Sequence, residues 1–202
     1  MLYLWLYPLH TDFAIFNVFR YLSFRIIYAA VTAFIIAFVL APPMIRKLQE
    51  WGLGQNVREG GPSGHLSKIG TPTMGGILII FAVLLSTVLW ADITNAYVWL
   101  VMLSIVGFGL VGFVDDYVKI IRAQSTGLNV WQKLLAQIGV ALGIGLFFYS
   151  SPGYSTELSV PFFKSFTPDL GPFYVPFAIL VIVGCSNAVN LTDGLDGLAI
   201  GP

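Results

Sequence analysis

The sequence predicts an all-α polytopic membrane protein with five transmembrane helices and a small extracytoplasmic β-hairpin. Of the 202 residues 57% are hydrophobic and only 10% are charged, whereas a soluble chain carries about a quarter charged residues. The charges are also clustered, and they leave charge-free stretches at 26–45, 69–91, 93–114, 134–156 and 170–192. At about 1.5 Å of rise per residue, each stretch is long enough for a helix to cross about 30 Å of hydrocarbon.

The five helices are expected near residues 24–41, 74–91, 96–114, 132–150 and 173–190, in one integral-membrane domain that covers 1–202. Proline is expected to stop a helix, and prolines lie at the ends of three of these spans: Pro42, Pro43, Pro152 and Pro172. The connecting segments are then two inner loops, 42–73 and 115–131, and one outer loop, 151–171.

The distribution of Lys and Arg predicts the orientation, because cytoplasmic loops carry an excess of these residues. An odd number of spans places the termini on opposite sides. One side holds Arg46, Lys47, Arg58, Lys68, Lys119, Arg122 and Lys133, and the other holds only Arg20, Arg25 and Lys164. The N-terminus is therefore expected outside and residue 202 on the cytoplasmic side. The aromatic opening segment lacks a cleavage signature and suits an interfacial helix on the outer surface.

The two longest loops differ in character. In the outer loop, apolar residues alternate at Leu158, Val160 and Phe162 around Pro161, which predicts the β-hairpin. The long inner loop is too rich in glycine for regular structure, and such loops usually carry function.

Composition excludes several classes of protein. A formal net charge of zero gives no basic surplus for nucleic acid. The single cysteine, Cys185, allows no intrachain disulfide and no cysteine-based zinc site. Gly107, Gly109 and Gly112 match a dinucleotide fingerprint, but they lie inside a membrane span, where close helix packing explains them better.

Asp115 and Asp116 end the third predicted span and are followed by Lys119. The lysine lies one helical turn from each carboxylate, so it can balance their charge. Because adjacent carboxylates repel, one of them is a candidate base or metal ligand. An ordinary juxtamembrane charge cluster is the alternative.

Polar residues recur every third position after the last span, at Asn187, Asn190, Asp193 and Asp196. A straight helix would spread this row over about half its circumference, so a break at a glycine such as Gly194 is needed for the side chains to converge. Carboxamides suit a nucleobase or an amide, and carboxylates suit a sugar hydroxyl or Mg²⁺. The alternative is a polar helix cap and turn.

The segment 68–76, Lys-Ile-Gly-Thr-Pro-Thr-Met-Gly-Gly, opens the second predicted span. Thr71 or Thr73 could serve simply as a helix cap around Pro72. The N-terminus of the helix, beside Lys68, would also favour an anionic ligand.

Taken together, these three motifs closely resemble those of the phospho-N-acetylmuramoyl-pentapeptide transferases, the translocase I family of bacterial peptidoglycan synthesis. The family belongs to the polyprenyl-phosphate hexose-1-phosphate transferase superfamily. The similarity covers the whole chain, including Gln55, Arg58, Gly61, Pro62 and His65.

The resemblance implies a Mg²⁺-dependent transfer of phospho-MurNAc-pentapeptide from UDP-MurNAc-pentapeptide to undecaprenyl phosphate, which gives lipid I and UMP in a bacterial inner membrane. Asp115 and Asp116 are the expected catalytic carboxylates and metal ligands. The residues expected to bind substrate are Lys68, Lys119, Lys133, Asn187, Asn190, Asp193 and Asp196. The sequence leaves open a direct attack or an aspartyl intermediate, and also a homodimer.

Members of the family have about ten membrane helices, so this chain is expected to form about half of that fold, with the main Mg²⁺ ligand in the other half. The chain alone is therefore expected to be inactive. Three alternatives are a related UDP-N-acetylhexosamine:polyprenyl-phosphate transferase, a transporter, and a noncatalytic membrane fragment. Acidic residues at helix ends rather than near the midplane argue against a transporter.

Overall fold

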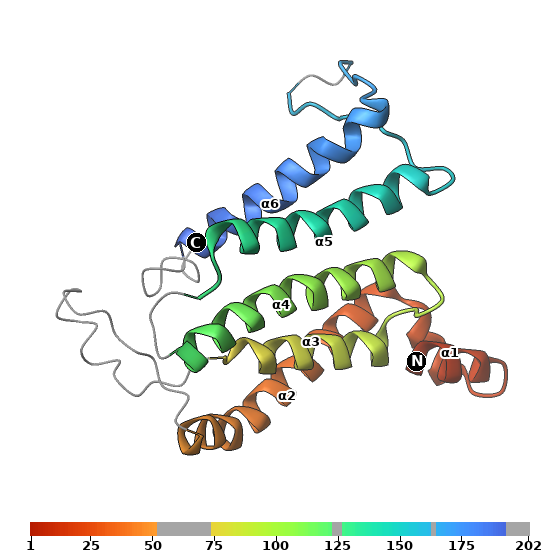
Figure 1. Ribbon diagram of the computed structural model, residues 1–202. Coiled ribbons are helices and arrows are strands. Elements are labelled where there is room, and N and C mark those ends of the chain that lie inside the picture. The colour runs from red at the N-terminus through yellow and green to blue at the C-terminus, as the bar shows by residue number, and fades with distance from the viewer. Residues whose placement is uncertain (52–73, 123–126, 163–164, 193–202) are drawn as a thin grey trace. The chain divides into compact units, whose positions relative to one another are not determined.

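The computed structural model describes residues 1–51, 74–122, 127–162 and 165–192 (Figure 1). These residues are mostly helical, as predicted, and they contain no β-sheet. The chain divides into two compact units, Met1–Leu128 and Asn129–Pro202, each with its own helix packing.

The first unit is built on three helices: α2 (Leu22–Glu50), α3 (Gly76–Trp90) and α4 (Ala96–Arg122). α3 packs against both of the others, and neighbouring helices in the chain run antiparallel (Figure 1). Ala82 and Ser86, one turn apart on α3, are buried. Such small side chains let helices approach closely in a membrane.

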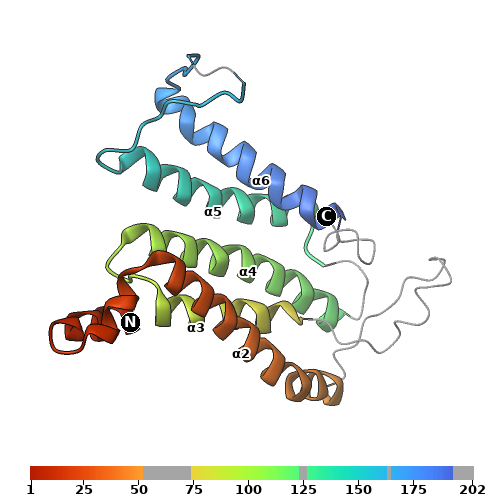
Figure 2. The ribbon, with the colours of Figure 1, turned by 180° about the vertical axis from the view of Figure 1, so that it is seen from behind.

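α2 continues through Pro42 and Pro43 to Glu50, although the sequence predicted a helix end at the first proline. Each proline removes one backbone hydrogen bond and crowds the preceding turn. The last turns of α2 run in a different direction from the rest of the helix (Figures 1 and 2). This bend lets the helix continue beyond the prolines, and Leu48 on the continued turns is buried.

Within the described residues, four helical segments are long and apolar enough to cross a membrane: Leu22–Glu50, Ala96–Arg122, Val130–Ser150 and Gly171–Thr192. α3 is apolar but has only 15 residues, so it reaches about 22 Å at 1.5 Å per residue, short of a hydrocarbon core about 30 Å thick. The structure therefore supports a multi-pass membrane protein, while the count of five spans is not confirmed.

The start of α3 explains its short length. Met74, the expected first residue of that span, has a left-handed backbone with φ 70°, which a right-handed helix does not accommodate. The helix therefore begins two residues later, at Gly76.

The N-terminal segment forms α1 (Leu2–Leu6) and two 3₁₀ helices, Tyr7–Thr11 and Ala14–Arg20. It packs at the end of α3 that carries Trp90, where the Phe19 and Trp90 rings stack with their centroids 6.1 Å apart. The Trp90 indole Nε1 donates to the Thr32 hydroxyl of α2 at 2.9 Å. The Met1 ammonium donates to the Val88 carbonyl at 2.6 Å, so the opening residues are tied to the first unit by this bond as well as by aromatic packing.

The second unit is an antiparallel pair of helices, α5 (Val130–Ser150) and α6 (Tyr174–Thr192) (Figure 2). α5 begins at a capping box in which the Asn129 side chain accepts from the backbone and the Gln132 side chain accepts from the Asn129 N–H at 3.2 Å. Along α5, the buried residues recur every fourth position, at Gln137, Ala141 and Gly145. These positions lie on one face of the helix.

Close helix packing at Gly145 makes this glycine sensitive to larger side chains. A Cβ placed there would lie 3.4 Å from Val175 Cγ1 and 3.6 Å from the Val175 Cα, so Gly145→Ala should be accommodated. Gly145→Val adds two methyl groups beyond the Cβ of alanine, and we expect this crowding against α6 to destabilise the α5–α6 pair by about 1–3 kcal/mol. Thermal unfolding in detergent measures the effect. Gly139→Val is the control, since a Cβ at Gly139 would meet nothing within 4 Å. Equal melting temperatures for the two valine variants would contradict the prediction.

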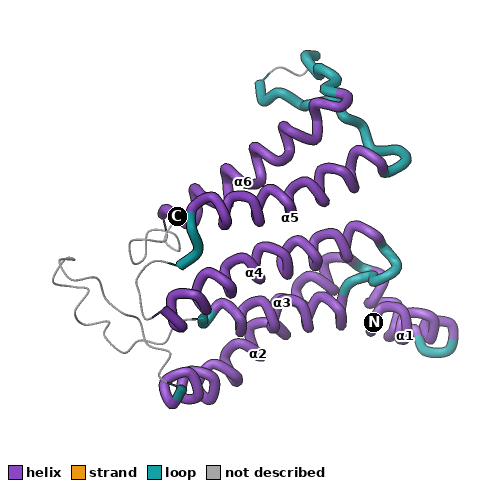
Figure 3. Tube along the Cα trace, viewed as in Figure 1, coloured by secondary structure: helices purple, strands orange, loops and turns teal. Residues whose placement is uncertain are grey.

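The β-hairpin predicted in the outer loop is not formed by the described residues. Pairing is limited to one antiparallel bridge between Glu157 and Asp169, and Figure 3 shows the described part of the loop without strands. The Leu158 N–H donates to the Pro168 carbonyl at 2.9 Å, and the Leu170 N–H donates to the Thr156 carbonyl at 3.1 Å. The alternation of apolar residues was misleading because Pro161 and Pro168 cannot donate to a strand ladder.

The bridge in this loop is expected to weaken in acid. The Asp169 carboxylate accepts hydrogen bonds from the Thr156 hydroxyl and, at 3.0 Å, from the Gly171 N–H, and the Thr156 bond is the main reason why the pKa of Asp169 is lowered. Because the folded-state pKa is below the unfolded one, the stabilisation is complete above about pH 4 and is lost as pH falls through the lowered pKa.

Hydrogen exchange of the Leu158 and Leu170 amides tests this expectation. After correction for intrinsic rates, protection should fall between pH 5 and pH 3 in the wild type, whereas Asp169→Asn should remove this pH dependence. Protection that is the same at both pH values would contradict the prediction.

Candidate active site

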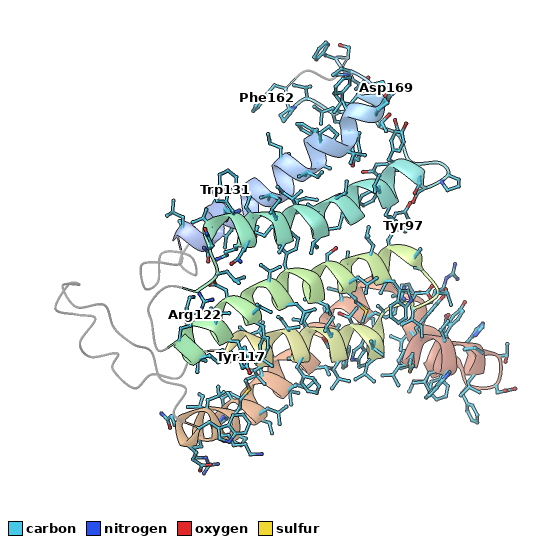
Figure 4. The ribbon with its side chains drawn as sticks, viewed as in Figure 1. Tyr97, Tyr117, Arg122, Trp131, Phe162 and Asp169 are labelled. Atoms are coloured by element: carbon cyan, nitrogen blue, oxygen red, sulfur yellow. The ribbon has the colours of Figure 1, made fainter. Side chains whose placement is uncertain are left out.

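The two adjacent aspartates lie on the last turns of α4, with Lys119 one turn further along. The Lys119 Nζ lies 2.8 Å from Asp115 Oδ2 and 2.9 Å from Asp116 Oδ1. One ammonium group therefore bridges both carboxylates, as the spacing of the three residues predicts. Figure 4 labels Tyr117 and Arg122 on the same turns of the helix.

Asp115 is held from two sides. It is only 8% exposed, and its Oδ1 accepts a hydrogen bond from the Leu128 backbone N–H at 2.8 Å, while its Oδ2 pairs with Lys119. Hydrogen bonds to an ionised carboxylate are stronger than those between neutral groups. The backbone after α4 therefore fixes the position of this carboxylate.

Gly127 is part of the same arrangement because its missing side chain makes room for Asp115. A Cβ at Gly127 would overlap Asp115 Oδ1 and lie 2.7 Å from the Asp115 carbonyl oxygen and 2.8 Å from Asp115 Cγ. Cβ atoms in folded proteins essentially never make contacts shorter than 3.0 Å. Only glycine fits while the carboxylate is in place.

Asp116 is in a different environment from its neighbour. Its side chain is 36% exposed, compared with 11% for the Asp115 side chain. Adjacent residues on a helix point about 100° apart, which explains why one carboxylate is enclosed and the other is accessible. Asp116 is therefore the more available group for a ligand.

The end of the first unit that carries these aspartates also holds the end of α2 and the start of α3 (Figure 1). Arg46 and Lys47 lie on the last turns of α2. The described residues of the first unit that the sequence predicts on the inner side thus gather at one end of its helices. The opposite end carries the 91–95 turn, where the Thr94 N–H donates to the Asp92 carboxylate at 3.0 Å.

The second unit carries three of the residues expected to bind substrate. Lys133 is half-buried in the first turn of α5, and Asn190 is exposed near the end of α6. Asn187 is half-buried, and its Nδ2 donates to the Gln137 Oε1 of α5 at 2.8 Å and to the Val183 carbonyl at 2.9 Å. Lys68, Asp193 and Asp196 lie outside the described residues, as does His65.

The carboxylates differ in how well they suit Mg²⁺. Among the described residues, no group of three or more His, Cys, Asp or Glu side chains could hold a metal ion. In proteins, however, Mg²⁺ is often held by one or two carboxylates together with phosphate oxygens of the substrate. The accessible Asp116 fits such a role. To bind the metal ion, Asp115 would have to give up its contact with Lys119.

Two contacts of the candidate site residues were missed in the sequence: that of Gln137 with Asn187 and that of Gly127 and Leu128 with Asp115. Gln137 is a single carboxamide in an otherwise apolar stretch, four and eight residues before Ala141 and Gly145, and this spacing was the available signal. The contact of Gly127 and Leu128 with Asp115 had no local signal, because it depends on how the chain turns after α4.

Comparison with known proteins agrees with the motifs. The model of glycosyl transferase family 4 matches residues 98–202, and phospho-N-acetylmuramoyl-pentapeptide-transferase signature 1 matches residues 68–80. Three similar curated proteins all carry the name phospho-N-acetylmuramoyl-pentapeptide-transferase. They come from Syntrophus aciditrophicus (strain SB), Citrifermentans bemidjiense and Maridesulfovibrio salexigens, and they are 55%, 54% and 58% identical.

Each of these alignments covers 100% of this chain and 56% of the relative. The chain thus spans about half the length of the curated relatives it matches. The resemblance carried by the three motifs is confirmed: the chain belongs to glycosyl transferase family 4 and bears the signature of the phospho-N-acetylmuramoyl-pentapeptide-transferases.

Proposed function

We propose that this chain serves in an enzyme that transfers phospho-MurNAc-pentapeptide from UDP-MurNAc-pentapeptide to undecaprenyl phosphate. In this reaction an oxygen of the lipid phosphate forms a bond to the sugar-linked phosphorus of the nucleotide. The bond between that phosphorus and the oxygen bridging to UMP breaks, so the products are lipid I and UMP. The support is the paired Asp115–Asp116–Lys119 geometry on a chain that carries the family signature.

The charges of the site suit two anionic substrates. Lys119 already balances two carboxylates at 2.8 and 2.9 Å, and it can turn toward phosphate oxygens as they arrive. We propose that Lys68 and Lys133 also contact phosphate, since positioned cations stabilise the charge of a transferring phosphoryl group. We propose that Asn190, Asp193 and Asp196 contact the uridine and sugar.

The accessible carboxylate of Asp116 has two proposed roles. It can accept a proton from the attacking lipid phosphate, or it can hold Mg²⁺, which when bound would offset the charge of the diphosphate. Asp115, which is enclosed and tied to the Leu128 N–H, is proposed to position Lys119. These roles correspond to direct attack. An aspartyl intermediate would instead require one of the two carboxylates to form the bond to phosphorus and release UMP, before the lipid phosphate oxygen displaces that carboxylate.

We propose a bacterial inner membrane as the location, with the N-terminus outside and the Asp115 end of α4 on the cytoplasmic side. The excess of Lys and Arg at that end supports this orientation. In a Cys185→Ala background, a cysteine at position 47 should react with a thiol reagent only after the membrane is made permeable. A cysteine at position 92 should react in intact cells, and the reverse pattern would contradict the orientation.

The function is tested by assaying UMP release with Mg²⁺, UDP-MurNAc-pentapeptide and undecaprenyl phosphate. The assay uses this chain alone and a chimera in which the chain is joined to the remaining residues of the Syntrophus aciditrophicus relative. We expect UMP release from the chimera and none from the chain alone. A folded chimera that releases no UMP, while the unmodified relative does, would overturn the proposal.

A transporter remains the competing class of function. It would bind substrate without releasing UMP, so the same assay separates the two. A related transferase acting on UDP-N-acetylhexosamine is separated by the donor: it would release UMP from that sugar nucleotide and not from UDP-MurNAc-pentapeptide. The match of signature 1 to residues 68–80 favours the muramoyl substrate.

A further inference from the structure

Two carboxamides meet between α5 and α6. Gln137, in the second turn of α5, is 3% exposed, and its Oε1 accepts from Asn187 Nδ2 at 2.8 Å. The same Nδ2 donates to the Val183 carbonyl, one turn earlier in α6, at 2.9 Å. An asparagine amide has two hydrogens to donate, so these two bonds use both of them.

The neighbours of Asn187 determine which way its amide faces. A backbone carbonyl can only accept a hydrogen bond, so the amide atom beside the Val183 oxygen must be the nitrogen. The amide atom left for a ligand is then Oδ1, which can only accept. A ligand at this atom must therefore bring a hydrogen-bond donor.

The packing of α5 against α6 keeps the Gln137 and Asn187 carboxamides opposite each other. The buried face of α5 continues from Gln137 to Ala141, which is 0% exposed, and to Gly145. At Gly145 the backbone of α6 comes so close that a Cβ would lie 3.6 Å from the Val175 Cα and carbonyl oxygen. Near Gly145, small residues set the distance between the two helices. Near Gln137, the hydrogen bond between the two carboxamides sets how the helices are rotated relative to each other.

We propose that Gln137 is a positioning residue that fixes the Asn187 carboxamide with its carbonyl toward the substrate. In that orientation Asn187 selects a donor, a hydroxyl or an N–H of the nucleotide sugar, and does not contact phosphate or carbonyl oxygens. The inference rests on the proposed function for its substrate, while the orientation of Asn187 itself can be measured without activity.

The orientation is tested on the chain itself in detergent micelles. With ¹⁵N-labelled asparagine, the side-chain amide signals of Asn187 are identified by their loss in Asn187→Ala. We expect these hydrogens to exchange with water more slowly than those of the exposed Asn190. Gln137→Met, which keeps the length of the side chain but removes the acceptor, should speed the exchange at least tenfold.

Two variants control this measurement. Gln137→Glu keeps an acceptor oxygen and should keep the slow exchange. Gln49→Met makes the same chemical change at an exposed position on α2 and should leave the Asn187 signals unchanged. Unchanged exchange in Gln137→Met would overturn the proposal.

The consequence for recognition is tested in the chimera. We expect Gln137→Met to raise KM for UDP-MurNAc-pentapeptide about tenfold and to leave KM for undecaprenyl phosphate within twofold. The melting temperature should fall only modestly: one Asn187 N–H loses its acceptor, while methionine fills the space of the glutamine side chain. Gln137→Glu should stay near the wild-type KM. A Gln137→Met chimera that melts lower with both KM values unchanged would show a structural role only and overturn the proposal.

The exchange measurement and the kinetic measurement together separate this inference from the proposed function. If the unmutated chimera releases no UMP, the proposed function fails, and the recognition role of Asn187 fails with it. If UMP is released but Gln137→Met leaves the Asn187 exchange unchanged, only the positioning role of Gln137 fails.

Discussion

Replacing Asp116 with asparagine is expected to lower the rate of UMP release by the chimera about 10²- to 10⁴-fold. The substitution keeps the shape of the side chain and removes its charge, so the group can neither accept a proton nor hold Mg²⁺ well. Because Asp116 is 36% exposed and shares Lys119 with a second carboxylate, its loss should cost little stability. The rate should therefore fall while the melting temperature stays within a few degrees.

Asp115→Asn and Asp92→Asn complete this comparison. Asp115→Asn weakens the pairing of an enclosed group with Lys119, so it should lower both the melting temperature and the rate. Asp92→Asn makes the same chemical change at the opposite end of α3 and α4 and should leave the rate unchanged. If Asp116→Asn retains more than a third of the wild-type rate, Asp116 is not a catalytic residue.

Replacing Gly127 with alanine is expected to lower the rate about 10²-fold, because it displaces Asp115 and with it Lys119, and a shift of about 1 Å in a residue that positions the site can have an effect of this size. The added methyl group would overlap Asp115 Oδ1 and lie 2.8 Å from Asp115 Cγ. Either the carboxylate or the backbone that donates to it must move, and the bond from the Leu128 N–H lengthens. Single-turnover measurement of UMP release by the chimera checks the chemical step.

Two controls distinguish crowding at Asp115 from a general effect. Gly143→Ala adds a methyl group where a Cβ meets nothing within 4 Å, and Leu128→Ala keeps the backbone donor to Asp115. Both should retain most of the activity. A fully active Gly127→Ala variant would show that the position of Asp115 does not limit the reaction.

The sequence predicted those features that depend on neighbours in the chain. The contacts of Lys119 with Asp115 and Asp116 follow from helical spacing alone. The mostly helical, multi-pass character follows from the long apolar stretches. α2 continues past the expected end at Pro42 because a bent helix can accommodate a proline. The predicted hairpin is not confirmed, because alternation at Leu158 and Val160 does not ensure a strand ladder.

Features that depend on distant residues could not be predicted in this way. The bond between Asn187 and Gln137 joins residues 50 positions apart, so a pattern read along one helix identified Asn187 only as a candidate for substrate binding. The contact of the Leu128 N–H with Asp115 similarly depends on the path of the chain after α4.

The carboxamide pair between α5 and α6 also bears on how the protein enters the bilayer. A helix inserted alone would expose the Gln137 carboxamide to lipid, where no water satisfies it and the cost is several kcal/mol. Arrival of α6 gives the Gln137 Oε1 a donor. Insertion of the two helices together as a hairpin is therefore favoured over stepwise insertion. A nascent chain that stops before α6 would leave the Gln137 carboxamide in the membrane without a hydrogen-bond partner from α6.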